Sequence, residues 1–367
     1  MNHLIHFYIL GFEVDMKDKI LVYVFIIYIF IFSILGIIFK DKEISYMERR
    51  KLKTFPEFSL NSNYITNLEK YLLDHFPFRD SFRSIKASFN YNVLNKLDNN
   101  GIYLKDNYIF KKETLDKKSI INFKNHINKT KSYFKNNNIY MVIIPDKNYY
   151  LESKDFIKLD YNYLYNELNI LNLKTIDIRK DLNLNSYYET DTHWKQEKLT
   201  KVIKTINKGM NNPNEEQRFK ENKYNNFYGV YYTEAAIKRG AEELIYLEND
   251  IINNSYVTYL ENKDLHTVYN LNKLTSLDSY EVYLDGASAF IEIENKNSTT
   301  NKELIIFRDS FGSTLTPLLI NNYKKITLID NRYINSSNYL NLIELKDQDI
   351  LFLYSTLVVN NSFSLKN

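Results

Sequence analysis

Cysteine is absent from this chain of 367 residues. Its absence excludes a disulfide framework, a thiolate metal site and a cysteine nucleophile. It also suits a protein that faces an oxidising exterior, although it does not require that location. The length is enough for one large domain, or two smaller ones, with a hydrophobic core.

Long basic runs of the kind that suggest nucleic acid binding are lacking as well. The net charge is only +3, and lysine is mixed with aspartate and glutamate along the chain. Since nucleic-acid-binding proteins usually carry a basic patch, we expect no nucleic acid partner. The six histidines show no paired spacing such as HExxH, so we expect no metal site and no cofactor.

The run Ile20–Phe39 contains no charged residue. A helix of that length spans the hydrocarbon core of a bilayer. No small-x-small cleavage site follows, so we predict an uncleaved transmembrane anchor at 20–39 behind a cytoplasmic N-terminus at 1–19. The remaining chain is expected to be extracytoplasmic, because large domains translocate largely regardless of flanking charge.

Two features of the N-terminus leave alternatives open. A plain count of the flanking lysines and arginines favours the opposite orientation, with the C-terminal side in the cytoplasm. Met16-Lys-Asp-Lys19 also makes an ordinary start for a signal anchor, in which case the first fifteen residues are a mis-assigned extension.

Residues 40–100 are predicted to form a helical connector. Apolar residues recur there at helical spacing, and Pro77 interrupts the pattern. Asp98–Gly101 is a strong turn signal, after which Ile102–Phe110 is expected to form a short β-hairpin.

Beyond residue 100, strand-like and helix-like segments alternate, which predicts one α/β domain at 101–367 with a largely parallel sheet. The expected helices are Ser119–Asn136, Tyr161–Leu171, Lys195–Met210 and one near Tyr339–Leu345. The expected strands are Ile139–Ile144, Lys174–Ile178, Glu303–Phe307, Lys325–Ile329 and Ile350–Tyr354. Residues 211–300 alternate weakly and are rich in asparagine, so we expect an insertion of loops and short antiparallel strands there.

A candidate nucleophile follows the apolar run Leu304–Phe307. The sequence turns at once into Asp309-Ser310-Phe311-Gly312 and then into a helix-compatible segment, Thr314–Ile320. Such a turn lies at the carboxyl edge of the sheet, where ligands bind in open α/β folds. It also places Ser310 near a helix N-terminus, whose N–H groups favour developing negative charge. The alternative is that Asp309 or Ser310 merely caps the helix.

A candidate base lies in Thr190-Asp191-Thr192-His193-Trp194. A serine hydroxyl needs a base within hydrogen-bond reach, and the base needs an orienting acceptor. His193 can be that base and Asp191 that acceptor, while Trp194 is available to wall the site or stack on a sugar. Two alternatives remain: Asp191 or Thr192 caps the next helix with Trp194 in the core, or Asp191 and His193 bind a metal ion.

These stretches resemble the DHHW family of bacterial proteins, which is related to the alginate O-acetyltransferase proteins of the SGNH-hydrolase-like superfamily. The most specific matches are Asp191-Thr-His193-Trp194 and Asp309-Ser-Phe-Gly312. The other matches follow in the family's order after the apolar run at 20–39: Glu48–Pro56, Phe76–Asp80, Pro145–Lys147, Tyr228-Gly229, Ile329–Tyr333 and Leu351–Thr356. The resemblance implies a three-layer, flavodoxin-like SGNH-hydrolase-type domain behind one transmembrane helix, with Asp191, His193 and Ser310 as its triad.

The chain departs from the family at two places. Thr192 stands where the family's name has a second histidine, and Asp285-Gly286-Ala287-Ser288 stands where many relatives carry Gly-Gly-Asn-His. Because Ala287 cannot supply an asparagine donor, an oxyanion hole would need other donors. The candidates are the Ser310 N–H, the Gly229 N–H, Arg332 and Tyr333.

Residues and resemblance together predict an extracytoplasmic O-acyl (acetyl) transferase that acts on a cell-surface or secreted glycan. A carbohydrate esterase of the same fold is one alternative, and a non-catalytic glycan-binding surface protein is another. The resemblance adds a multi-span O-acyltransferase as a partner that delivers the acetyl group. Glycan and membrane are the other expected partners.

Overall fold

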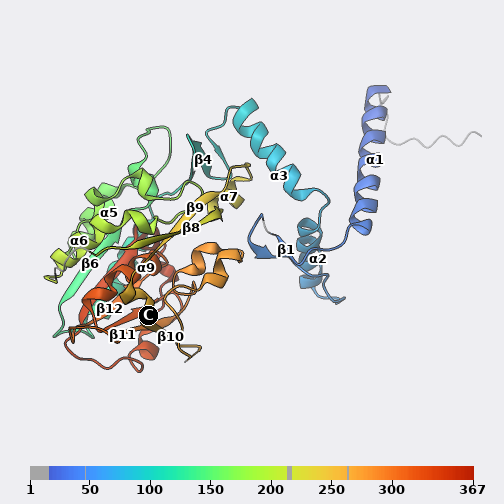
Figure 1. Cartoon of the computed structure of the whole chain (residues 1–367). Coiled ribbons are helices and arrows are strands. Elements are labelled where there is room, and N and C mark those ends of the chain that lie inside the picture. Colours follow the sequence, from blue (N-terminus) through green and yellow to red (C-terminus); the bar gives the residue numbers. More distant parts are fainter. Residues whose placement is uncertain (1–15, 46, 213–216, 263) are drawn as a thin grey trace, which may run out of the picture. The chain divides into compact units, whose positions relative to one another are not determined.

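The computed structural model describes residues 16–45, 47–212, 217–262 and 264–367 (Figure 1). Most of the predicted cytoplasmic N-terminus, and the suggested extension before Met16, therefore lies outside the described residues. The chain divides into two compact units, with the boundary between Ile85 and Lys86.

The first unit begins with α1 (Met16–Ile38), which includes nearly all of the predicted span. From Lys17 to Ile38 the helix is long and apolar enough to cross a membrane, with a mean hydropathy of 2.9, and it is not buried inside the protein. The strands β1 (Ile44–Ser45) and β2 (Arg50–Lys51) pair antiparallel.

The predicted helical connector is present as two helices, α2 (Ser62–Asp74) and α3 (Arg79–Ser88). Asn61 caps α2 by accepting a hydrogen bond from the Tyr64 N–H. The two helices are separated at Pro77, as expected from the conformational restriction that proline imposes on the preceding residue.

The second unit opens with a small antiparallel sheet. Its strands are β3 (Asp98–Asn99), β4 (Ile102–Lys105) and β5 (Tyr108–Lys111), so the predicted hairpin at 102–110 is confirmed. Asn100 and Gly101 form the turn with φ values of 53° and 76°, a left-handed conformation that favours these two residue types.

The main sheet of the second unit has seven strands in the order β10-β11-β13-β12-β14-β6-β7. The strands from β13 to β7 in this order are parallel, whereas β11 pairs antiparallel with both β13 and the edge strand β10. The bounds are β6 Ile139–Ile144, β7 Lys174–Thr175, β10 Ser255–Tyr259, β11 Phe290–Asn295, β12 Glu303–Arg308, β13 Lys325–Ile329 and β14 Asp349–Ser355. The predicted α/β fold with a mostly parallel sheet is thus confirmed.

Both faces of this sheet are buried, because successive side chains of a strand point to opposite faces. In β6, Val142 and Ile144 enter one apolar core and Met141 and Ile143 enter the other. The first core is completed by α6 (Thr200–Gly209), α9 (Phe311–Leu315) and the antiparallel pair β8 (Lys220–Phe227) and β9 (Glu242–Glu248). The second is completed by α4 (Lys117–Lys131), α5 (Tyr161–Asn169) and α11 (Thr356–Asn360).

Several predicted elements differ from those observed. The helix expected near Tyr339–Leu345 is α10 (Ser336–Tyr339), which ends where the prediction began. The helix after Ser310 is only α9, and it continues as a 3-10 helix, Thr316–Asn322, with Pro317 near its start. The 211–300 region also contains α7 (Val230–Ala235) and α8 (Asp250–Asn253). It is not wholly an insertion, because β10 and β11 join the main sheet.

Candidate active site

The carboxyl edge of the parallel strands collects polar residues from distant parts of the chain. Strand β12 leads into Asp309-Ser310, β6 into Asp146-Lys147 and β14 into Ser355. The buried Asp309 carboxylate joins two of these strand ends, since it accepts hydrogen bonds from the Phe311 N–H at 3.0 Å and the Ser355 N–H at 2.7 Å. Asp309 therefore serves the start of α9, and the Ser310 side chain makes no capping bond.

Asp191, His193 and Ser310 form one continuous line of hydrogen bonds. His193 Nε2 lies 2.8 Å from Ser310 Oγ, and His193 Nδ1 lies 2.6 Å from Asp191 Oδ1. His193 and Asp191 are buried, whereas Ser310 is partly exposed. The arrangement can take a proton from the serine hydroxyl and stabilise the imidazolium that results.

The Asp191 carboxylate is held by more than the imidazole. Oδ1 also accepts the His193 backbone N–H at 2.9 Å, and Oδ2 accepts the Val230 N–H at 2.8 Å. Burial alone would raise the pKa of Asp191, but the His193 charge and these hydrogen bonds lower it below its ordinary value. Asp191 therefore stays ionised while it orients His193.

Two charged groups, the buried Lys147 and the partly exposed Glu242, hold the segment that carries Asp191. Lys147 Nζ donates to the carbonyl oxygens of Tyr188, Glu189 and Asp191 at 3.2, 3.1 and 2.7 Å. On the other side, the Glu242 carboxylate accepts the Glu189 N–H at 2.6 Å and the Thr190 N–H at 2.7 Å. Burial lowers the pKa of Lys147 to about 7, although the nearby acidic groups, Asp191 and Glu242 first among them, act to raise it.

Gly229 packs directly against the same segment. Its N–H donates to Thr190 Oγ1 at 2.9 Å, so it is already used within the protein. A Cβ atom at this position would lie 2.2 Å from the Thr190 carbonyl oxygen and 2.4 Å from Asp191 Cβ. Gly229 thus permits the close approach of α7 to the triad, and its N–H is not free for an oxyanion.

Trp194 is fully buried in the core, and its Nε1–H donates to the Phe311 carbonyl at 3.2 Å. A buried indole offers no surface for a sugar, so the stacking role expected from the sequence does not fit this position. The walls around His193 are Tyr280, stacked on the imidazole with ring centroids 3.9 Å apart, and Phe311 at 4.9 Å.

Arg332 and Tyr333 follow β13 at the same edge of the sheet. The Arg332 guanidinium donates twice to the buried Asp330, at 2.9 and 2.6 Å, while Tyr333 is 47% exposed. Within the described part of the chain, no hydrogen bond links either residue to Asp191, His193 or Ser310. Among the described residues, the Ser310 N–H also makes no hydrogen bond, which leaves it as the backbone donor beside the nucleophile.

The segment that replaces the family's Gly-Gly-Asn-His adopts a left-handed turn. Leu284, Asp285 and Gly286 have φ values of 53°, 55° and 82°. Asp285 takes the first glycine position, and aspartate is one of the few residues that tolerate this conformation. Ala287 has no side-chain donor, so an oxyanion hole here would need other groups.

Lys147, Glu242 and Tyr280 are site residues that the sequence analysis missed. Lys147 had a signal, since it belongs to the Pro145-Asp-Lys match. Glu242 and Tyr280 had none, because they lie in the region predicted to be a loop-rich insertion. Only in the folded chain does Glu242 bind Glu189 and Thr190, and Tyr280 stack on His193.

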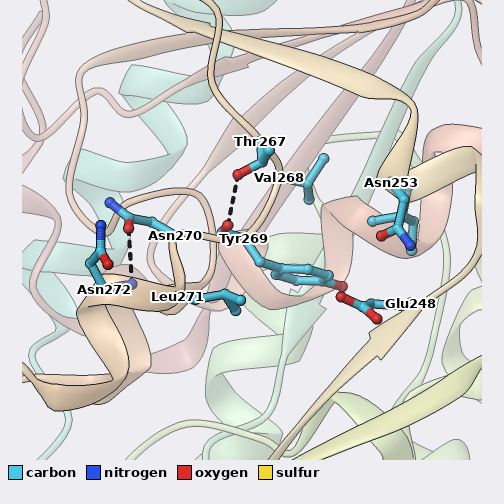
Figure 2. A pocket seen from close by; sticks show the side chains of 9 residues that line it. Glu248, Asn253, Thr267, Val268, Tyr269, Asn270, Leu271 and Asn272 are labelled. Carbon is cyan, nitrogen blue, oxygen red and sulfur yellow. Dashed lines mark hydrogen bonds between the residues drawn. The ribbon is translucent and has the colours of Figure 1, made fainter.

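The triad belongs neither to a group of metal-binding side chains nor to the cavity drawn in Figure 2. In the part of the chain that the structure describes, no group of three or more His, Cys, Asp or Glu side chains is placed to hold a metal ion. The cavity has a volume of about 400 Å³ and is lined by residues around Tyr269, including Glu248 and Asn253, but by no triad residue (Figure 2).

A comparison with known protein families finds a match within the second unit. Residues 150–329 match the family described as DHHW protein. The resemblance to the DHHW family is thereby confirmed. Among curated protein sequences, none matches this chain.

Solved structures support the same fold. A DHHW family protein from Eubacterium siraeum DSM 15702 superposes with a TM-score of 0.58 and 19% identity, over 74% of this chain and 97% of that one. Bacillus cereus PatB1, determined with a sulfonyl adduct, gives a TM-score of 0.58 and 18% identity, over 72% of this chain and 100% of that one. A weaker likeness, with a TM-score of 0.42 and 11% identity, is to the O-acetyltransferase domain of Pseudomonas putida AlgJ, over 71% and 92% of the two chains.

Proposed function

We propose that this protein is a membrane-anchored, extracytoplasmic O-acetyltransferase of SGNH type, which acts on a cell-surface or secreted glycan. The observation that carries the proposal is the hydrogen-bonded line from the buried Asp191 through His193 to the partly exposed Ser310. A helix cap would not need this line, and the capping role at α9 is already filled by Asp309.

In the first step, Ser310 Oγ attacks the carbonyl carbon of an acetyl donor as His193 Nε2 takes the hydroxyl proton. Asp191 stabilises the imidazolium, and the same proton then passes to the leaving group as the acetyl–Ser310 ester forms. The free Ser310 N–H and the N-terminal end of α9 lie beside the carbonyl oxygen, where they stabilise its negative charge.

In the second step, His193 removes a proton from an acceptor hydroxyl as its oxygen attacks the acetyl–Ser310 ester. The ester bond to Ser310 breaks, and His193 returns the proton to Ser310 Oγ. A sugar hydroxyl as acceptor makes the enzyme a transferase, whereas water makes it an esterase. The same triad serves both, so the esterase remains the second candidate. The non-catalytic glycan-binding alternative loses one support, because Trp194 is buried.

The location in this proposal rests on α1. Its apolar length fits a bilayer span, and the catalytic unit would follow it outside the cytoplasm. An acetyl donor outside the membrane would have to be delivered across it, which a multi-span O-acyltransferase partner would do.

A sulfonyl fluoride tests the nucleophile directly. Such reagents lose fluoride when an activated hydroxyl attacks their sulfur, and Bacillus cereus PatB1 is known with a sulfonyl adduct. We expect mass spectrometry to locate the adduct on Ser310 in the unmodified sequence. Ser310→Ala should abolish the adduct and His193→Ala should slow it strongly, while Ser313→Ala, a change in the same helix, should leave it in place. Labelling of Ser310 that is equally fast without His193 would refute the triad.

The acceptor is tested separately, with p-nitrophenyl acetate as donor. Acetate release without an added glycan, unchanged when oligosaccharides are supplied, would favour the esterase. Acetylated oligosaccharide that depends on Ser310 would support the transferase.

A further inference from the structure

The loop between α2 and α3, together with the start of α3, packs on the apolar helix α1 through aromatic rings. Phe32 of α1 stacks on Phe76, with centroids 5.3 Å apart and an interplanar angle of 2°, and it lies 5.8 Å from Phe82. About two turns later, just after α1 ends, Phe39 meets Phe78 edge-on at 5.3 Å. We call Phe76–Ile85 the aromatic corner.

The aromatic corner covers one stripe of α1. Within the described part of that helix, Phe32 and Leu35 are half-buried and the other side chains from Lys17 to Ile38 are exposed. The corner is itself uncovered on its outer side. Phe78, Phe82 and Ile85 are 53%, 40% and 63% exposed, a dense group of large apolar side chains for a surface in water.

The position of Phe32 along α1 indicates whether the aromatic corner contacts water or lipid. The span Lys17–Ile38 is about as long as the hydrocarbon core of a bilayer, so its end lies near the lipid boundary. Phe32 precedes that end by almost two turns, roughly 9 Å along the axis at a helical rise of ~1.5 Å per residue. Rings in contact with Phe32 therefore lie at or below the headgroup region when α1 spans the membrane.

Ion pairs join β2, α2 and α3 next to the aromatic corner. Glu48 contacts Arg79 at 2.8 Å and Arg50 at 2.7 Å, and Arg50 also donates to Asp74. These contacts tie the β2 strand to the end of α2 and the start of α3, which fixes the direction in which the aromatic corner points. Lys40 and Lys42 follow α1 directly and suit anionic headgroups.

We propose that the aromatic corner is a second membrane contact, inserted into the leaflet where α1 ends, with lipid acyl chains around Phe78, Phe82 and Ile85. The inference rests on the membrane anchoring in the proposed function. It makes α1 and the corner one interfacial unit, which holds the start of the connector at the lipid surface rather than leaving it as a free tether. Burial of amphipathic, aromatic segments at the headgroup boundary is favourable for the same reason that apolar burial is elsewhere.

The absence of cysteine allows a direct test on the full-length chain. Single variants Phe82→Cys, Ile85→Cys, Ile29→Cys in α1 and Glu69→Cys on the exposed side of α2 are labelled with an NBD fluorophore. Each is reconstituted in vesicles of phosphatidylcholine and phosphatidylglycerol, with and without nitroxide-labelled lipids. We expect nitroxide lipids to quench the probes at positions 29, 82 and 85 and to leave the probe at 69 unquenched.

The outcomes distinguish membrane anchoring by α1 from membrane contact by the aromatic corner. Quenching at 29 without quenching at 82 and 85 would keep the anchor and overturn the membrane contact of the corner. A blue-shifted but unquenched probe at 82 would likewise overturn it, because the side chain would then be covered by protein. No quenching at 29 would remove the anchor and this inference with it, while the sulfonyl adduct on Ser310 would be unaffected.

Discussion

Lys147 and Glu242 hold opposite sides of the peptide segment Tyr188–Asp191. The ammonium group binds three of its carbonyl oxygens, and the carboxylate binds two of its N–H groups. Lys147 follows β6 of the main sheet, and Glu242 begins β9 of the separate β8–β9 pair. The position of Asp191 therefore depends on both of these parts of the fold. This segment is irregular, and some of its backbone groups pair with other backbone groups, such as the Glu189 carbonyl with the Ile109 N–H. The remaining buried polar groups need side chains as partners.

Replacement of Lys147 tests this clamp. Lys147→Met removes three hydrogen bonds. The Glu189 carbonyl keeps the Ile109 N–H at 2.9 Å, but the buried Tyr188 and Asp191 carbonyls lose their donor. Each buried group left unpaired costs about 1–3 kcal/mol. We expect a clear fall in melting temperature and slower sulfonylation of Ser310, because Asp191 is no longer held. Lys154→Met, at an exposed lysine, should change neither. A Lys147→Met protein with unaltered stability and labelling rate would show that the clamp is dispensable.

A methyl group at Gly229 should disturb the triad without touching a catalytic side chain. In Gly229→Ala the new Cβ would meet the Thr190 carbonyl oxygen at 2.2 Å, so the backbone must move. We expect lower activity toward p-nitrophenyl acetate together with lower thermal stability. The matched control is Gly240→Ala, where nothing lies within 4 Å of the added atom. Equal behaviour of the two variants would argue against close packing at Gly229.

The triad residues should fail as a unit. Ser310→Ala removes the nucleophile and His193→Ala removes the base, so the double variant should have the same residual activity as either single one. Because Ser310 makes no capping bond, its replacement by alanine should change the free energy of unfolding by under ~1 kcal/mol. Rate losses that multiply in the double variant, or a marked loss of stability in Ser310→Ala, would contradict this.

Asp191 should make stability depend on acidic pH. Its folded pKa is lowered, so its stabilising contribution is fully present above the unfolded pKa, near 4. That contribution is lost as the pH falls from there through the lower folded pKa. In Asp191→Asn the position cannot titrate, so the difference in unfolding free energy between the two proteins should shrink as the pH falls below about 4. A difference that stays constant over this range, in urea unfolding curves, would rule out the shift.

The sequence by itself determined the elements whose signals are local. Apolar runs placed β6 and β13 at their observed bounds, and α1 followed from the length of the uncharged run. The convergence of Asp191, His193 and Ser310 was also predicted from sequence, because a strand-to-helix turn and a D-x-H-W segment are short patterns. The antiparallel hairpin at 102–110 was predictable for the same reason, since Asn100-Gly101 suits a left-handed turn.

Only the tertiary structure decided which distant residues complete the site. It buried Trp194, engaged the Gly229 N–H with Thr190, brought Tyr280 onto His193 and set Lys147 and Glu242 around Asp191. It also showed that β10 and β11, which the sequence had assigned to an insertion, are strands of the main sheet. Propensity and periodicity are properties of neighbours along the chain, whereas these contacts join residues far apart in sequence. Their partners are chosen by the packing of the whole core and by the need of each buried polar group for a hydrogen bond.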